Sequence, residues 1–313
     1  MKKILVLLSL CAGFMATAQQ NPQYSLFMFN KQVFNPAYAG AKNTLSLNAD
    51  YRWQWTGFGD GAPETFSFGA HSPIIKGSAI SKSSVGVVFL HDAIGFAESN
   101  QINLQYAYRV RVFEKSTLSF GLQASGNFST YDYNKFNNAA STTGDDALSD
   151  GGQSEFSPNL GAGLYLASDQ YYVGISSTEL LSNELASDNR EPVRHFYAMA
   201  GYIQRLNENF KLRGNALLKY VEIDAFDSPT SADFNLSAIY QDRFILGASF
   251  RTDETFSVLT QVQVTNNLNV GYAYDFKTGN YHTSGGNSHE VFLGFDLGAK
   301  NAKFTTPRFV SLF

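Results

Sequence analysis

The sequence predicts an all-β protein: a closed antiparallel transmembrane β-barrel of about fourteen strands, preceded by an irregular segment. Three observations predict this fold class. Large apolar residues alternate with small or polar residues along most of the chain, the connections between these stretches differ systematically in length, and the chain begins with an export signal. Because lipid cannot hydrogen-bond a free sheet edge, a sheet that crosses a membrane must close on itself.

The alternation is clearest in residues 268–276. The large apolar residues there are Leu268, Val270, Tyr272, Tyr274 and Phe276. The residues between them are small or polar, namely Asn269, Gly271, Ala273 and Asp275. A period of two places the two sets on opposite faces of a strand. One hairpin of a soluble sandwich would show the same pattern, so the barrel prediction rests on its recurrence along the chain.

The first residues, Met1–Ala18, have the pattern of a signal peptide. A basic pair is followed by the apolar run Ile4–Phe14, which is too short to span a bilayer, and by Ala16-Thr17-Ala18, a typical cleavage site. We therefore expect an exported chain that begins at Gln19. A lipoprotein signal at Cys11 is a weaker alternative, because the preceding residue is a large leucine.

Composition excludes several classes of protein. Cys11 is the one cysteine, so the exported chain has no thiol for a disulfide or a metal site. Removing Lys2 and Lys3 from the 23 basic residues leaves 21 against 27 acidic residues, a net charge of −6. Nucleic-acid binding needs a basic stripe, which is absent from the sequence. No later apolar run is long enough for a membrane-spanning helix, and we expect no cofactor.

The segment 19–43 precedes the first strand. Pro36 fixes its own φ and favours an extended Asn35, and Gly40 supplies a break. The segment is rich in aromatic residues, which need an apolar surface. We expect it to lie against or inside the barrel wall as a plug, with a periplasmic tail as the alternative.

Alternation and turn residues place one barrel domain at 44–298, followed by a periplasmic tail at 299–313. The expected strands lie approximately at 44–53, 64–74, 83–91, 99–110, 116–126, 157–167, 170–177, 193–205, 209–219, 232–240, 243–251, 256–264, 268–276 and 288–298. An even number of strands is the rule for single-chain bacterial barrels.

The connections should alternate in length. The odd-numbered ones are expected to be long, at 56–63, 92–98, 127–156, 178–192, 221–231 and 277–287. The even-numbered ones are expected to be tight, at 112–115, 168–169, 206–208, 241–242 and 265–267. Two connections break this rule, since 75–82 reads as long and 252–255 as tight. Long extracellular loops and short periplasmic turns are typical of outer-membrane barrels, and they predict that both termini are periplasmic.

Several short motifs in the chain carry a resemblance. They are Gln23-Tyr24-Ser25, Met28-Phe29-Asn30, Asn35-Pro36-Ala37-Tyr38-Ala39-Gly40, Tyr51-Arg52, Gln54-Trp55, Gly61-Ala62-Pro63, Ala70-His71-Ser72-Pro73, Gly271-Tyr272-Ala273-Tyr274-Asp275 and Ser288-His289-Glu290. Together they make the exported chain similar to the PorP/SprF family of type IX secretion-system outer-membrane proteins.

The resemblance implies a non-enzymatic component of the type IX secretion system, linked in some members to gliding motility. It implies that the partners are outer-membrane lipid, secreted proteins with a C-terminal sorting domain, and periplasmic or outer-membrane components of the system. The alternative is a diffusion channel for small solutes, since a barrel of this size can enclose a lumen. A barrel hydrolase is disfavoured because the sequence lacks a Gly-x-Ser-x-Gly elbow.

Eight residues are candidates for partner binding: Asn35, Pro36, Tyr38, Trp55, His71, Asp145, Asp146 and Asp150. Five of them also have a structural interpretation. His71 could satisfy local backbone, Trp55 could belong to the aromatic girdle, and the three aspartates could form a solvated loop without the spacing of a calcium site. Charged residues expected in the lumen, where they would hold a plug or simply line the wall, are Arg109, Arg111, Lys219, Asp233 and Arg251.

Overall fold

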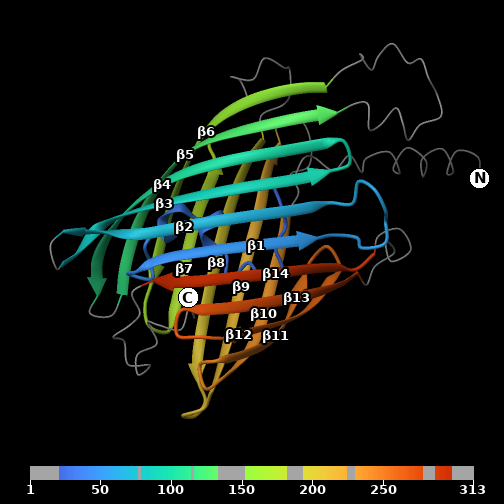
Figure 1. Ribbon diagram of the computed structural model, residues 1–313. Helices are drawn as coiled ribbons and strands as arrows, with labels where there is room; N and C mark the ends of the chain where they lie inside the picture. The colour runs from blue at the N-terminus through green and yellow to red at the C-terminus, as the bar shows by residue number, and fades with distance from the viewer. Residues whose placement is uncertain are drawn as a thin grey trace, which may run out of the picture.

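The computed structural model describes residues 21–76, 79–113, 116–132, 152–181, 193–223, 230–277 and 286–297. Within these ranges fourteen antiparallel strands form one closed barrel, in which every strand pairs with its neighbours in sequence and β1 pairs with β14 (Figure 1). The strands are β1 (Leu45–Trp53), β2 (Glu64–Lys76), β3 (Ala79–Ile94), β4 (Ala97–Phe113), β5 (Ser116–Asp132), β6 (Gly152–Ala167), β7 (Tyr171–Glu179), β8 (Val193–Arg205), β9 (Phe210–Ile223), β10 (Thr230–Tyr240), β11 (Phe244–Arg251), β12 (Thr255–Gln263), β13 (Leu268–Lys277) and β14 (Ser288–Leu297). The predicted fold class is confirmed.

Two predicted connections are wrong in length. The connection expected at 75–82 is short, because β2 continues to Lys76 and β3 begins at Ala79. The one expected at 92–98 is also tight, because β3 ends at Ile94 and β4 begins at Ala97. The apolar alternation stops where the wall leaves the lipid, whereas backbone pairing continues beyond that point. In these two hairpins the strand ends predicted from the side-chain pattern are therefore too early.

The two ends of the barrel differ in their connections. At one end the connections are 77–78, 114–115, 168–170, 206–209, 241–243 and 264–267, and we call this the short-turn end. At the other end, the long-connection end, they are 54–63, 95–96, 133–151, 180–192, 224–229, 252–254 and 278–287. Leu45, where β1 begins, pairs with Leu297, where β14 ends, so both lie at the short-turn end.

The wall has an apolar outer face and a polar inner face, as the alternation predicts. On β13, Tyr272 and Phe276 are exposed, whereas Asn269 and Asp275 are buried. Large side chains elsewhere on the outside are exposed to a degree that is rare on a soluble monomer, with Leu246 at 64%. This exposure is expected when lipid replaces water as the surrounding solvent.

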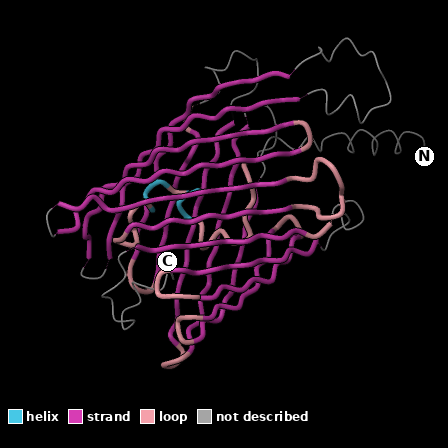
Figure 2. Tube along the Cα trace, viewed as in Figure 1, coloured by secondary structure: helices cyan, strands magenta, loops and turns pink. Residues whose placement is uncertain are grey.

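Residues 21–44, which we call the plug, lie inside the barrel (Figure 2). The plug contains a short helix, α2 (Lys31–Phe34), and a 3-10 turn, η1 (Pro36–Tyr38). At its first residues it contacts the long-connection halves of β8 and β9, and at Lys42 it pairs with Asp296 near the short-turn end. The plug therefore runs lengthwise through the lumen, with Asn21 toward the long-connection end.

Some expectations fall outside the described residues. They concern the signal peptide at 1–18, the tail at 299–313 and most of the long connection at 127–156.

No helix in the described part of the chain is long and apolar enough to cross a membrane.

Close approach of the plug to the wall predicts the effect of one substitution. A Cβ at Gly121 on β5 would overlap the backbone of Ala37 in η1, whereas a Cβ at Gly214 on β9 would meet nothing within 4 Å. Gly121→Ala should therefore lower the free energy of unfolding by about 1–3 kcal/mol, the usual cost of overpacking. The measurement is urea unfolding of the protein folded into lipid vesicles.

Gly214→Ala is the matched control, and it should change the same free energy by less than about 1 kcal/mol. Equal effects of the two substitutions would contradict the close contact between η1 and β5.

Candidate functional site

The plug takes its shape from residues that the sequence singled out. Asn35 is extended (φ −140°, ψ 112°), as expected before Pro36, and its Oδ1 accepts a hydrogen bond of 2.9 Å from the Ala37 N–H at the start of η1. Its Nδ2 donates to the Leu164 carbonyl on β6 at 3.0 Å. Asn35 thus caps the turn with one side-chain atom and attaches it to the wall with another.

An amide ladder joins the plug to β2–β5. Gln32 Nε2 donates to the carbonyl of Ala70 at 3.1 Å and to Oε1 of Gln105 at 3.1 Å. Gln105 Nε2 in turn donates to the Gln32 carbonyl at 3.1 Å and to Gln123 Oε1 at 2.9 Å. These side chains are almost fully buried, so each bond also removes the cost of leaving a buried amide unsatisfied.

A further attachment is a group of buried charges that we call the ionic anchor: Arg52, Asp275 and Glu290. Arg52 Nη2 lies 2.6 Å from Asp275 Oδ2, and Arg52 Nη1 lies 2.8 Å from Glu290 Oε2. Plug residues complete the group. The Ser25 hydroxyl donates to Asp275 at 2.7 Å, and the backbone N–H groups of Ser25 and Leu26 donate to the two oxygens of Glu290 at 2.7 and 2.8 Å.

A second ion group lies beside the anchor. Asp233 accepts from Arg251 at 2.5 Å and lies 2.7 Å from the Lys219 ammonium. Arg251 also donates to the Tyr24 carbonyl at 3.1 Å, and Lys219 donates to Gln23 Oε1. Three of the charges expected in the lumen therefore pair with one another and hold the plug.

The other two charges expected in the lumen behave differently. Arg109 is buried and donates to Asn43 at the end of the plug and to Ser84 on β3, at 2.8 and 2.9 Å. Arg111 is on the same inward register of β4 as Arg109, but it is exposed because it lies near the end of the strand, at the short-turn end.

His71 and Tyr38 form the contact at the end of η1. His71 is buried on β2, and its Nδ1 accepts a hydrogen bond of 3.0 Å from the Gly40 N–H, so this nitrogen carries no proton. The Tyr38 ring meets the rings of His71 and Tyr165 edge to face, each at 5.5 Å. The backbone group that His71 satisfies is not local, because Gly40 is 31 residues away in the sequence and belongs to the plug.

Lys31 of α2 is a buried cation without a carboxylate within ion-pair distance among the described residues. Its ammonium donates to the Met28 carbonyl at 2.5 Å and lies 4.9 Å from the Tyr172 ring and 5.5 Å from the Tyr38 ring. Burial lowers the pKa of Lys31 well below its usual range, and Arg213 lowers this pKa further. Aromatic faces supply the electrostatic support that an acid would otherwise give.

The remaining candidate residues are elsewhere. Trp55 lies in the connection between β1 and β2 with a positive φ of 55°, its ring 5.5 Å from the Lys277 ammonium and 5.9 Å from the Phe58 ring. Asp145, Asp146 and Asp150 fall outside the described residues. Asn35, Pro36 and Tyr38 therefore belong to the plug and His71 of the wall contacts it, whereas Trp55 lies at the long-connection end.

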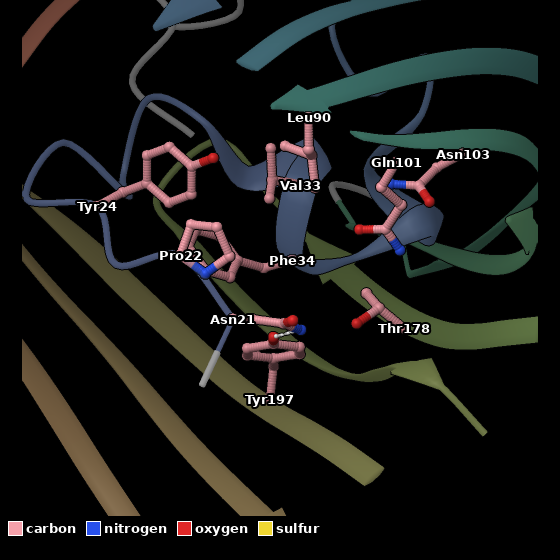
Figure 3. A pocket seen from close by; sticks show the side chains of 10 residues that line it. All are labelled: Asn21, Pro22, Tyr24, Val33, Phe34, Leu90, Gln101, Asn103, Thr178 and Tyr197. Atoms are coloured by element: carbon pink, nitrogen blue, oxygen red, sulfur yellow. Dashed lines mark hydrogen bonds between the residues drawn. The ribbon is translucent and has the colours of Figure 1, made fainter. Parts of the chain in front are cut away.

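A small cavity of about 20 Å³ lies between the first plug residues and the wall (Figure 3). Tyr24 and Phe34 of the plug and Asn103, Thr178 and Tyr197 of the wall are among the residues that line it. Asn21 Nδ2 donates to the Tyr197 hydroxyl at 2.9 Å, and these two residues also line a second small cavity. No group of His, Cys, Asp and Glu side chains in the described ranges is arranged to hold a metal ion.

The ionic anchor was not among the candidate residues, although the sequence contains a signal for it. Ser25, Arg52, Asp275 and Glu290 all lie within the motifs that carry the family resemblance. Arg52, Asp275 and Glu290 also occupy inward positions on strands, where a charge is costly unless it is paired. Listing charged residues at inward positions would have found the anchor, but not which charges pair.

An apolar outer face, a polar lumen and a closed sheet of fourteen strands define the protein as an outer-membrane β-barrel. The model of one protein family, described as type IX secretion system membrane protein PorP/SprF, matches residues 16–295. The chain belongs to this family. No curated protein sequence matches the chain.

Solved structures with a similar fold are outer-membrane barrels of low sequence identity. The outer membrane protein Omp33 of Acinetobacter baumannii is 12% identical with a TM-score of 0.42, over 82% of this chain and 98% of that one. A Pseudomonas aeruginosa FadL homologue is 12% identical with a TM-score of 0.45, over 90% and 96%. The CymD monoaromatic hydrocarbon channel is 13% identical with a TM-score of 0.47, over 87% and 92%.

The ionic anchor predicts a large effect of removing one carboxylate. Glu290→Ala leaves Arg52 with one carboxylate partner, Asp275, and leaves two plug N–H groups without an acceptor, so the free energy of unfolding should fall by about 3–5 kcal/mol. Urea unfolding in lipid vesicles measures this change.

Glu222→Ala is the matched control, because Glu222 pairs with Arg194 where both side chains are more than a third exposed. Its cost should be about 0–1 kcal/mol. A Glu290→Ala variant as stable as the control would show that the anchor does not hold the plug.

Proposed function

We propose that this protein is a non-enzymatic, plugged outer-membrane component of the type IX secretion system. It binds secreted proteins that carry a C-terminal sorting domain and couples them to periplasmic or outer-membrane components of the system. Family membership supports the secretion role. The observation that favours binding over solute diffusion is the plug, which fills the lumen and is attached by buried ion groups.

We propose that the long-connection end faces the cell exterior and the short-turn end faces the periplasm, as in other barrels with this asymmetry. The end of β14 at Leu297 is then periplasmic. Asn21 lies toward the long-connection end, so in this orientation the first plug residue is on the exterior side of the lumen. The expectation of a periplasmic amino terminus therefore does not extend to Asn21.

The surface proposed to meet secreted proteins is at the long-connection end. Trp55 and Phe58 lie there beside Lys277, and Phe58 is 56% exposed. The connection that carries Asp145, Asp146 and Asp150 leaves the same end of the barrel, after β5. We assign these residues to partner contact, whereas Asn35, Pro36, Tyr38 and His71 support it indirectly by holding the plug in place.

A cross-linking experiment tests the assignment of this surface. A photoreactive phenylalanine at Trp55 should capture a secreted protein with a sorting domain in the native outer membrane, and mass spectrometry should identify it. The same photoreactive residue at Gln204, which is exposed on β8 near the short-turn end, is the control and should not capture that protein.

A strain that lacks this protein tests the function as a whole. Normal secretion of every protein with a C-terminal sorting domain in that strain would refute the proposed function.

Conductance in planar bilayers distinguishes the plugged component from a diffusion channel. The wild-type barrel should be silent, whereas deletion of residues 21–41 should open a hydrated lumen lined by charged and amide groups. Heat-modified migration on a gel shows whether the deletion variant folds.

The double variant Asp275→Ala/Glu290→Ala keeps the plug but removes the carboxylates that accept its hydrogen bonds, so the pore should open intermittently. A steady open pore in the wild type would favour the channel.

A further inference from the structure

The two sides of β6 are paired to different extents. Its pairing with β5 continues along the whole strand, whereas its pairing with β7 covers only 162–167. A hydrogen bond of 2.8 Å from the Leu180 N–H to the Leu160 carbonyl lengthens this second contact, and the Asn159 side chain bonds to the next residue of that connection. Among the described residues, 153–158 therefore have a neighbouring strand on one side only, and we call them the free edge (Figure 1).

The direction of the backbone groups on the free edge follows from alternation. Along an antiparallel strand, the N–H and C=O groups of successive residues point to opposite neighbours. The Leu160 carbonyl points away from β5, since it accepts from Leu180. Pro158, Phe156 and Ser154 follow at steps of two residues, so their backbone groups also point away from β5. The free edge thus presents three carbonyls and, because proline has no N–H, two N–H donors.

The free edge begins where the wall leaves the lipid. The part of β6 that contacts β7 and the connection after it, 159–167, has about the nine to eleven residues that a tilted strand needs to cross. Within lipid an unpaired edge would have no partner for its hydrogen bonds. At the membrane surface water can solvate the edge, which remains a template for another strand. In the proposed orientation this surface is the cell exterior.

We propose that the free edge binds an extended segment of a secreted protein, which joins the wall as a further strand beside β6. Evenly spaced backbone donors and acceptors recognise another backbone in the same extended conformation. On the outward side the segment meets Phe156, whose side chain is 52% exposed and whose ring lies 4.7 Å from the Phe128 ring. On the inward side it meets the polar pair Ser157 and Asn127. The segment therefore alternates apolar with polar residues.

The connection that follows β7 is a poorer occupant than a secreted protein. Residues 182–192 have Leu185 as their one large apolar residue, and most of the others are Asn, Asp, Glu, Ala or Pro, which are depleted in strands. The connection that carries Asp145, Asp146 and Asp150 leads directly into β6, so the free edge continues the surface assigned to secreted proteins. Strand addition at this edge rests on the proposed function and supplies its mode of binding.

Photo-cross-linking in native outer membranes tests the free edge. A photoreactive phenylalanine in place of Phe156 should capture a secreted protein with a C-terminal sorting domain. Mass spectrometry of the cross-linked peptide should place the capture in an alternating segment of that protein. The same photoreactive residue at Phe234 is the matched control, because Phe234 is 53% exposed on the outward face of β10, which does not border β6. It should capture no secreted protein.

A backbone substitution separates strand addition from contact between side chains. Ser154→Pro removes an N–H that points to the free edge and keeps the N–H groups that pair with β5. It should lower the cross-linking yield at Phe156 about fivefold or more, whereas Ser154→Ala, which keeps the N–H, should change the yield less than about twofold. Heat-modified migration on a gel shows that both variants fold.

Capture of residues 182–192, or of a second copy of this chain, at Phe156 would overturn the proposal, because the free edge would then have another occupant. Equal yields from Ser154→Pro and Ser154→Ala would also overturn it. If a secreted protein is captured at Trp55 but not at Phe156, strand addition fails while the proposed function stands. Absence of capture at both positions would contradict both.

Discussion

The rest of the structure depends on the pairing of Arg52 with Asp275 and Glu290. Arg52 is on β1 and Glu290 is opposite it on β14, so the pair bridges the seam at which the barrel closes. The same two carboxylates accept hydrogen bonds from Ser25 and Leu26 of the plug. Removing one partner of a buried ion pair is strongly destabilising, because it leaves an uncompensated charge. Closure of the wall and seating of the plug are therefore two parts of one electrostatic arrangement.

The plug also depends on a wall that lets it approach. Gly121 on β5 receives the backbone of η1, and Gly163 on β6 receives the Asn35 side chain. On this side amide groups and close packing hold the plug, whereas on the opposite side charges hold it. The plug thus replaces the water that would otherwise fill a polar lumen of this width. A filled barrel is suited to present binding surfaces at its two ends, which agrees with the proposed role in secretion.

The sequence predicted the fold well because alternation is a local signal, and all fourteen predicted strands are present. It failed at 75–82 and 92–98 because hairpins continue past the apolar belt, where side chains no longer alternate. The site was harder to predict. Arg52 and Asp275 are 223 residues apart, and only the strand order around the closed barrel brings them together. His71 contacts the plug through Gly40, and its motif could not name this partner because the two residues are 31 positions apart.

The most direct test of a lumen filled by the plug is a cysteine pair at Asn30 and Ser67. Asn30 Nδ2 lies 2.8 Å from Ser67 Oγ across the boundary between plug and wall, and the exported chain is expected to contain no other cysteine. Oxidation in native outer membranes should give a disulfide-linked peptide on mass spectrometry, with a lone cysteine at position 30 protected from a membrane-impermeant maleimide. Absence of the link, together with labelling at position 30 as fast as at Thr56 in the first long connection, would contradict the account.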